Sequence, residues 1–194
     1  HDNGEIQNDM LHASIAVPEC PVGFFHMAMR LCPHQIRNKD YNGRLPLAIA
    51  AATTRNELRD SSSRPLPPFP SALQGSYDSS DAIIIRDLLK RYPEAARVAD
   101  MYGRVPIFLA LECGKLWEDG VEDILKCHMD VLFTTDPQTG LYPFMFAAAA
   151  GSKKVRLGAK SITEEDDDDA KQISTFYELL RKCPAAISMG DARK

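Results

Sequence analysis

The stretch that decides the fold runs from Tyr92 to Ala110 and reads YPEAARVADMYGRVPIFLA. The chain carries two further versions of this phrase. They read CPHQIRNKDYNGRLPLAIA from Cys32 to Ala50 and HMDVLFTTDPQTGLYPFMFA from His128 to Ala147. Self-similarity of this kind indicates a repeat architecture, in which each copy is one supersecondary unit that its neighbours help to bury. The phrase therefore predicts an array of similar units.

Each copy contains a glycine three residues before a proline. Glycine supplies the positive φ of a tight turn, and proline fits the first position of a helix, where its missing N–H costs nothing. The three pairs are Gly43 and Pro46, Gly103 and Pro106, and Gly140 and Pro143. The apolar run after each proline predicts a first helix, at Pro46–Thr53, Pro106–Gly114 and Pro143–Gly151.

A second, amphipathic helix is predicted in each copy, because apolar residues recur at the i, i+3, i+4 spacing. These helices are expected at Asp81–Arg91, Val121–His128 and Lys171–Lys182. A fainter copy precedes them, with helices at Met10–Ala16 and Val22–Leu31. We therefore predict an all-α chain of about four helix-turn-helix units, more than the roughly three repeats that a stable array needs.

Two long inserts separate a first helix from its second helix. Residues 53–81 are rich in serine and proline, and residues 152–170 contain the acidic run from Glu164 to Asp169. Inserts at the same place in the unit are typical of solenoids, where they map to one edge. We predict a single domain over residues 1–194, with repeats at approximately 1–36, 37–96, 97–132 and 133–188.

The unit resembles a divergent ankyrin repeat. That family joins a Leu-Leu pair to the pattern D-x-x-G-x-T-P-L-H-x-A. The matching residues in this chain are Leu88, Leu89, Asp100, Gly103, Pro106 and Ala110, and the other copies follow at nearly the same offsets. The match leaves out the two inserts and the far N-terminus, and the variant is similar to ankyrin-like proteins that are numerous in unicellular algae. The resemblance implies an ankyrin-type helical-repeat solenoid with short finger turns.

The chain also departs from the family pattern. The usual Thr before the proline is replaced by Leu45, Val105 and Tyr142, and the usual His two residues after it by Ala48, Phe108 and Met145. The glycine that ends the second helix is replaced by Pro33, Pro93 and Pro184. Proline still stops a helix. Because the hydrogen-bonding Thr and His are absent, we expect packing to hold the units together and other groups or water to cap the first helices.

In such arrays the turns project as fingers and form a concave face with the first helices, which is where partners bind. Tyr, Arg and Met are enriched at interface centres. By position, the predicted partner-binding residues are Tyr41, Asn42, Arg44, Met101, Tyr102, Arg104, Gln138, Thr139, Leu141 and Tyr142. The alternative is that Leu141 and Tyr142 pack inward and that the arginines are only solvated.

Composition narrows the class of protein. The 194-residue chain has 23 basic and 27 acidic residues, a formal net charge of -4, and no basic footprint for nucleic acid. No uninterrupted apolar stretch of about 18 residues exists, so no membrane span is expected. The cysteines are odd in number and lack a C-x-x-C pair, which indicates reduced thiols in an intracellular compartment, either cytoplasmic or organellar. They are Cys20, Cys32, Cys113, Cys127 and Cys183.

No catalytic, metal or cofactor site is predicted. The Cys127-His128 pair and the set of His12, His26 and His34 lack metal-ligand spacing. Cys113 has no base or orienting group that the sequence can assign to it. The phosphate-binding patterns G-x-x-x-x-G-K-[ST] and G-x-G-x-x-G are absent from the sequence. We expect a protein that is not an enzyme.

The first insert contains RPLPPFP, in which Arg64, Pro67 and Pro70 fit the Arg-x-x-Pro-x-x-Pro pattern. Such a segment favours polyproline II and could bind a proline-motif-binding domain of the Src-homology-3 type. The alternative is an insert that covers an apolar edge of its own repeat. Trp117 is expected to be a lid on the core of its repeat rather than an exposed anchor.

The acidic run of the second insert is expected to be a solvated loop. The alternatives are contact with a basic partner, phosphorylation of Thr163, and loose calcium binding. Together these features predict a non-catalytic protein–protein interaction module that binds a macromolecular partner through its finger turns and concave face. The alternative function is a permanent structural or accessory subunit of a large multiprotein assembly.

Overall fold

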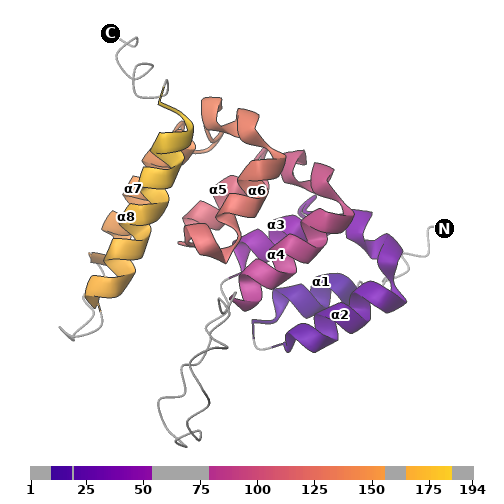
Figure 1. Cartoon of the computed structure of the whole chain (residues 1–194). Coiled ribbons are helices and arrows are strands. Elements are labelled where there is room, and N and C mark those ends of the chain that lie inside the picture. The colour runs from indigo at the N-terminus through magenta and orange to yellow at the C-terminus, as the bar shows by residue number, and fades with distance from the viewer. Residues whose placement is uncertain (1–9, 19, 54–78, 156–164, 185–194) are drawn as a thin grey trace, which may run out of the picture.

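The computed structural model describes residues 10–18, 20–53, 79–155 and 165–184. These residues form eight α-helices and several short 3-10 helices, and they contain no strand (Figure 1). The prediction of an all-α chain is confirmed. The helices are α1 (Met10–Ala16), α2 (Val22–Leu31), α3 (Pro46–Ala52), α4 (Ser80–Arg91), α5 (Pro106–Glu112), α6 (Val121–Cys127), α7 (Pro143–Val155) and α8 (Glu165–Lys182).

The helices pack as four consecutive pairs, α1 with α2, α3 with α4, α5 with α6, and α7 with α8. The odd-numbered helices lie side by side in one row, and α2, α4 and α6 form a second row (Figure 1). At the C-terminal end, α8 packs on α7 and on the 3-10 helix η4 (Trp117–Asp119). Trp117 is half-buried against the core, and its backbone N–H donates to Thr175 Oγ1 of α8 at 2.9 Å.

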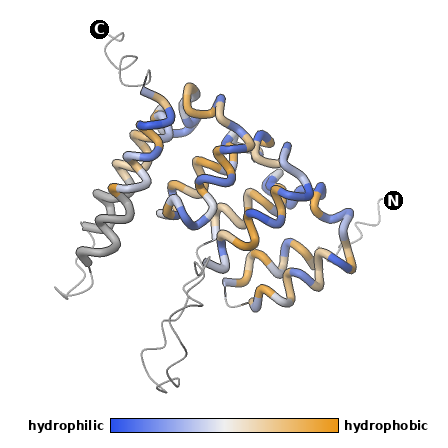
Figure 2. Tube along the Cα trace, in the orientation of Figure 1, coloured by the Kyte–Doolittle hydropathy of each residue, from blue (hydrophilic) through white to orange (hydrophobic). Residues whose placement is uncertain are grey.

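The row of first helices is held by apolar packing, as the sequence predicts. α3 and α5 begin at Pro46 and Pro106, and neither helix has a side-chain cap. Every residue of α3 from Pro46 to Ala51 is buried, so its alanines bring the helices on both sides close to it. The second helices are amphipathic instead, and Figure 2 shows hydrophobic and hydrophilic residues alternating along α4.

A 3-10 helix follows each of the first three second helices. These are η1 (Pro33–Arg37), η3 (Pro93–Arg97) and η5 (Met129–Phe133). The sequence predicts only that the prolines stop the preceding helix. The prolines also start the 3-10 turn, because a proline at the first helical position loses no hydrogen bond. Met129 begins the same turn without a proline, so burial of apolar residues such as Val131 and Leu132 is sufficient to form it.

The boundaries of the inserts are partly corrected. Residues 54–78 and 156–164 lie outside the described residues, as do Arg64, Pro67, Pro70 and Thr163. However, α7 continues to Val155 and α8 begins at Glu165, so the prediction of a loop over 152–170 is wrong at both of its ends. Carboxylates are favourable in the first turn of a helix, where they face the positive end of the dipole. The acidic run therefore starts α8 instead of interrupting the chain.

Candidate functional site

The first two turns are closed by an aspartate in the same way. Asp40 Oδ1 accepts hydrogen bonds from the N–H groups of Asn42 and Arg44 at 2.9 and 2.8 Å. Asp100 Oδ1 accepts two equivalent bonds, from Tyr102 and Arg104, both at 2.9 Å. An aspartate that caps its own turn fixes the backbone without help from the rest of the molecule. These turns are therefore rigid local structures.

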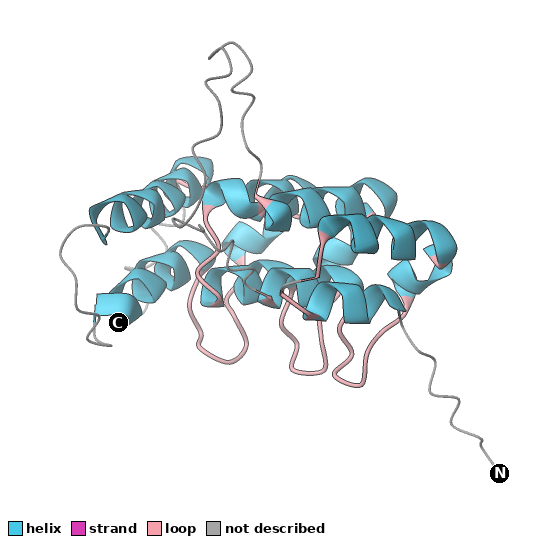
Figure 3. Ribbon diagram, turned by 90° about the horizontal axis from the view of Figure 1, so that it is seen from below, coloured by secondary structure: helices cyan, strands magenta, loops and turns pink. Residues whose placement is uncertain are grey.

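The glycines of the turns have two roles. Gly43 and Gly103 have φ values of 72° and 77°, which favour glycine. A Cβ at Gly43 would lie 3.1 Å from the backbone nitrogen of Met101 in the next turn. The same Met101 N–H donates to Asn42 O at 2.9 Å. The two turns are thus in direct backbone contact, and Figure 3 shows three turns that project side by side from one edge of the helix array.

The third turn has one more residue and a different set of bonds. Asp136 Oδ2 accepts from the N–H and the hydroxyl of Thr139, at 3.0 and 2.8 Å. The N–H of Asp136 donates to Leu141 O, and Gly140 N–H donates to Asp136 O. Asp136 therefore caps this turn as well, but it uses one carboxylate oxygen and leaves the other for a group outside the turn.

The predicted contact residues differ in exposure. Tyr41 is 89% exposed, and Met101 and Tyr102 are also exposed large side chains. Gln138 and Thr139 are exposed, whereas Asn42 and Arg44 are half-buried. Leu141 and Tyr142 are half-buried as well. Leu141 packs against the core, and the ring of Tyr142 stacks on that of Phe144 at a centroid distance of 6.1 Å, which agrees with the inward alternative for these two residues.

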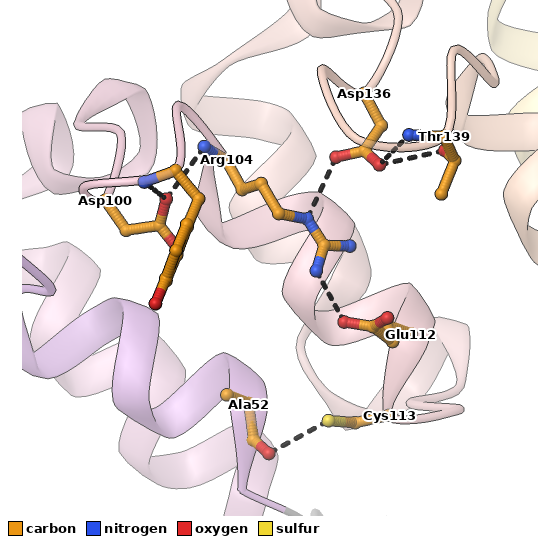
Figure 4. A network of polar contacts seen from close by, with 8 residues as sticks. Ala52, Asp100, Arg104, Glu112, Cys113, Asp136 and Thr139 are labelled. Atoms are coloured by element: carbon orange, nitrogen blue, oxygen red, sulfur yellow. Dashed lines mark hydrogen bonds and ion pairs between the residues drawn. The ribbon is translucent and has the colours of Figure 1, made fainter. Parts of the chain in front are cut away.

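Arg104 is the clear correction, because its side chain is not at a finger tip. The residue is only 5% exposed. Its Nε donates to Asp136 Oδ1 at 2.9 Å and its Nη1 donates to Glu112 Oε2 at 2.6 Å (Figure 4). The guanidinium also lies over the ring of Phe146, 5.8 Å from its centroid. Arg104 thus joins the second turn to the third, and the expectation that its side chain projects from a finger tip is corrected.

The equivalent arginine of the first turn behaves differently. Arg44 turns back to its own Asp40, with Nε and Nη2 both 2.9 Å from Oδ2. In the third turn the arginine position is taken by Leu141, so Asp136 has no arginine of its own. The free oxygen of Asp136 is what Arg104 binds. That missing arginine is the sequence signal that could have identified the cross-turn pair.

The Arg104–Asp136 pair lies in a site removed from water. The two side chains are 6% and 0% exposed. Burial acts to lower the pKa of Arg104, but its hydrogen bonds to Glu112 and Asp136 outweigh that effect and raise the pKa above its ordinary value. The guanidinium is therefore held in its charged form, in which it links the second unit to the third through Asp136.

A second buried cation, Lys115, bonds residues on both sides of the first insert. Lys115 Nζ donates to Asp81 Oδ2 at 2.5 Å and to Thr53 O at 2.6 Å, so it ties the start of α4 to the residue that follows α3. The neighbouring Cys113 donates its Sγ–H to Ala52 O at 2.9 Å (Figure 4). Burial raises the pKa of Cys113, which favours the thiol over the nucleophilic thiolate. Both residues serve the junction between the units.

The described residues were compared with the requirements of several other kinds of site. They contain no group of three His, Cys, Asp or Glu side chains that could hold a metal ion. No helix within this part of the chain is both long and apolar enough to span a bilayer. All five cysteines lie within the described ranges, and none of them forms a disulfide. The Src-homology-3 ligand prediction stays a prediction, because its residues lie outside those ranges.

Comparison with known proteins does not assign the chain to a family. No protein-family model matches the chain, and no curated protein sequence is significantly similar to it.

Proposed function

We propose that the chain is an ankyrin-type repeat array that binds a protein partner through its projecting turns, without catalysis. The observation that carries this proposal is the contrast between the rigid base and the exposed tips of the turns. Asp40 and Asp100 hold the backbone, while Tyr41, Met101 and Tyr102 point into solvent from it. Large side chains that the fold leaves mostly exposed at these positions are available for contact with another molecule.

The physical reason lies in the cost of binding. Ordering a flexible loop at an interface costs free energy, and a loop that is already fixed avoids that cost. Tyr and Met are enriched at the centres of protein interfaces, where they supply contact area for few rotatable bonds. The first two turns are fixed by their own aspartates and by the bond from Met101 N–H to Asn42 O. They therefore offer a preorganised apolar surface.

The packing of the chain supports the array. The first three helix pairs contact one another through both rows, and the fourth pair joins them through α5 with α7 and through η4 with α8. The turn between pairs recurs with the same aspartate-centred bonds at Asp40 and Asp100. The buried Arg104–Asp136 pair extends the link to the third turn. An array of this kind presents its turns as one continuous edge, so a partner can contact residues from several units at once.

The proposal is tested by affinity capture from the native source, with mass spectrometry of the proteins that bind. The chain is compared with a variant that carries Tyr41→Ala and Tyr102→Ala. Interface centres lose more than about 1 kcal/mol for each such truncation, so we expect at least a tenfold weaker capture. The matched control is Tyr177→Ala, which removes an exposed tyrosine from α8.

Loss of the same bound proteins in the turn variant but not in the control supports the proposal. Equal recovery with all three chains shows that binding occurs elsewhere. Far-ultraviolet circular dichroism of each variant establishes that the fold is intact before capture.

A further inference from the structure

A cavity lies between two of the second helices, α2 and α4. Its volume is about 330 Å³, at the lower end of the range of small-ligand sites. Met29 is only 2% exposed, so it lies at the base of the cavity, and exposed basic side chains surround the opening. The residues that line the cavity are His26, Met29, Arg30, Asp87, Lys90 and Arg91.

The charges that line this cavity do not balance. Asp87 is the one acid among the lining residues, and it is already paired. Its Oδ2 lies 3.0 Å from His26 Nε2, and its Oδ1 lies 3.3 Å from Lys90 Nζ. Within the described residues, the side chains of Arg30 and Arg91 have no hydrogen bond or ion pair. Three cations against one acid give the lining a net charge of +2 when His26 is neutral.

The next pair of second helices, α4 and α6, carries similar cations but supplies each of them with an acid. Arg86 Nε of α4 lies 3.3 Å from Asp123 Oδ2 of α6. Lys126 Nζ lies 3.0 Å from Glu122 Oε1. When the helices are aligned on their C-terminal ends, Lys126 is the equivalent of Arg30. The unpaired charge is therefore a property of the cavity between α2 and α4, and not of every unit.

Arg91 is the residue that makes α4 different from its neighbours. The equivalent position is Leu31 in α2 and Cys127 in α6. A cation in the last turn of a helix is favoured by the helix dipole, which accounts for a single basic residue at each helix end. The dipole does not occupy the N–H donors of a guanidinium, and two guanidinium groups beside one cavity repel each other. An anion in the cavity would satisfy the donors and remove the repulsion.

We propose that this cavity binds a phosphate monoester of a small organic molecule, with the phosphate between Arg30 and Arg91 and the organic group on Met29. A phosphate monoester carries a charge of about −1.5 to −2 and three acceptor oxygens, which matches a lining of net charge +2. A carboxylate is satisfied by one guanidinium, which binds both of its oxygens. The second arginine therefore favours the more highly charged phosphate.

The first measurement is isothermal titration calorimetry of the full chain with phenyl phosphate and with inorganic phosphate, at constant ionic strength. We expect a Kd for phenyl phosphate of about 1 mM or tighter. Inorganic phosphate should bind several-fold more weakly, because it buries no apolar surface on Met29. Absence of binding of phenyl phosphate up to about 10 mM, tenfold above that value, overturns the proposal. Equal affinity for the two compounds overturns the placement of the organic group.

Two double variants of equal charge test the role of the arginines. Arg30→Gln with Arg91→Gln removes both proposed phosphate ligands, and each change should weaken phenyl phosphate binding at least tenfold, because each removes a charged hydrogen bond. The control is Arg97→Gln with Arg181→Gln, which removes two exposed arginines of η3 and α8. The control should bind like the unmodified chain. An equal loss in both double variants shows that only net charge matters and refutes the site. Circular dichroism establishes that each variant is folded.

Methyl NMR locates the organic group. The ring of phenyl phosphate should shift the methyl signal of Met29, which is identified with Met29→Leu, and should leave that of Met101 at a turn unchanged. A shift at Met101 without one at Met29 refutes the cavity as the site.

A phosphotyrosine peptide distinguishes the source of the phosphate. Binding of the peptide at least tenfold more tightly than phenyl phosphate would make a modified protein the ligand and would overturn the small-molecule assignment. Similar affinities support it. The turns are not altered in any of these variants, so the outcomes are independent of the partner-binding proposal.

Discussion

Replacing Arg104 by alanine should destabilise the chain far more than replacing Arg44, although the two arginines occupy the same position in the repeated phrase. Arg104→Ala leaves the carboxylate of Asp136 buried, with Thr139 as its remaining hydrogen-bond donor. Arg44→Ala leaves Asp40 with two backbone donors, in a turn where the arginine is 27% exposed. The difference between the two variants therefore reports mainly the effect of burial, with smaller contributions from the other contacts of Arg104.

The magnitude follows from the surroundings of the pair. Breaking a buried ion pair costs about 3–5 kcal/mol, because one charge is left without compensation. The bond to Glu112 adds little, since that side chain is 45% exposed and exposed pairs contribute about 0–1 kcal/mol. The ring contact with Phe146 adds about 0.5–1 kcal/mol. We expect a loss of about 4 kcal/mol for Arg104→Ala and of about 1 kcal/mol or less for Arg44→Ala.

The assay is urea denaturation of the full chain, followed by far-ultraviolet circular dichroism. The urea slope has to be compared between variants, because a repeat array can lose one end before the other and the midpoint alone then misreports stability. A double variant, Arg104→Met with Asp136→Leu, removes both charges and should be less destabilised than the sum of its single changes. Equal effects of Arg104→Ala and Arg44→Ala would refute the reasoning, and so would strict additivity in the double variant.

Two further predictions concern Gly120 and His128. Gly120 has a φ of 105° and a Cβ there would lie 2.9 Å from two carbons of the buried Ile85, so Gly120→Ala should lower the unfolding free energy by about 2 kcal/mol or more. Gly23→Ala, where an added Cβ meets nothing within 4 Å, should instead stabilise α2 by up to about 1 kcal/mol, and a loss at both sites would contradict this steric reasoning. Burial lowers the pKa of His128 below its ordinary 6.5, so the unfolded chain binds the proton more readily. The contribution of His128 to stability is complete above the ordinary pKa and falls as the pH drops toward the lowered value. The urea midpoint should therefore decrease over this pH range, and His128→Gln should make that decrease smaller.

The positions of the turns and first helices could be predicted because their chemistry is local. Glycine at positive φ and proline at the first helical position act within a few residues, and Gly43 and Pro46 are found where the sequence places them. The direction in which an arginine side chain points is instead decided by residues far away in the sequence. Arg44 and Arg104 share a motif, but the partner of Arg104 is set by the missing arginine in the next turn. The partner of Arg104 is therefore predicted only by comparing its copy with the next one, and not from either copy alone.

The acidic run from Glu164 to Asp169 shows a second limit of prediction from the sequence. Composition favours a solvated loop at Glu164–Asp169, because a block of like charges is unfavourable in most helices. Its place in the chain reverses the conclusion, since the block stands at the N-terminus of α8, where the helix dipole favours it. The same residues would interrupt a helix if they lay in its last turn. A charge run therefore has to be judged from the helix end that it would occupy.

The inward position of Arg104 also changes how an effect on partner binding should be understood. Its backbone N–H is fixed by Asp100 and its side chain holds Asp136, the residue that orders the third turn through Thr139. Loss of the side chain would let the second and third turns move relative to each other, so a partner that spans both would bind less tightly without touching Arg104.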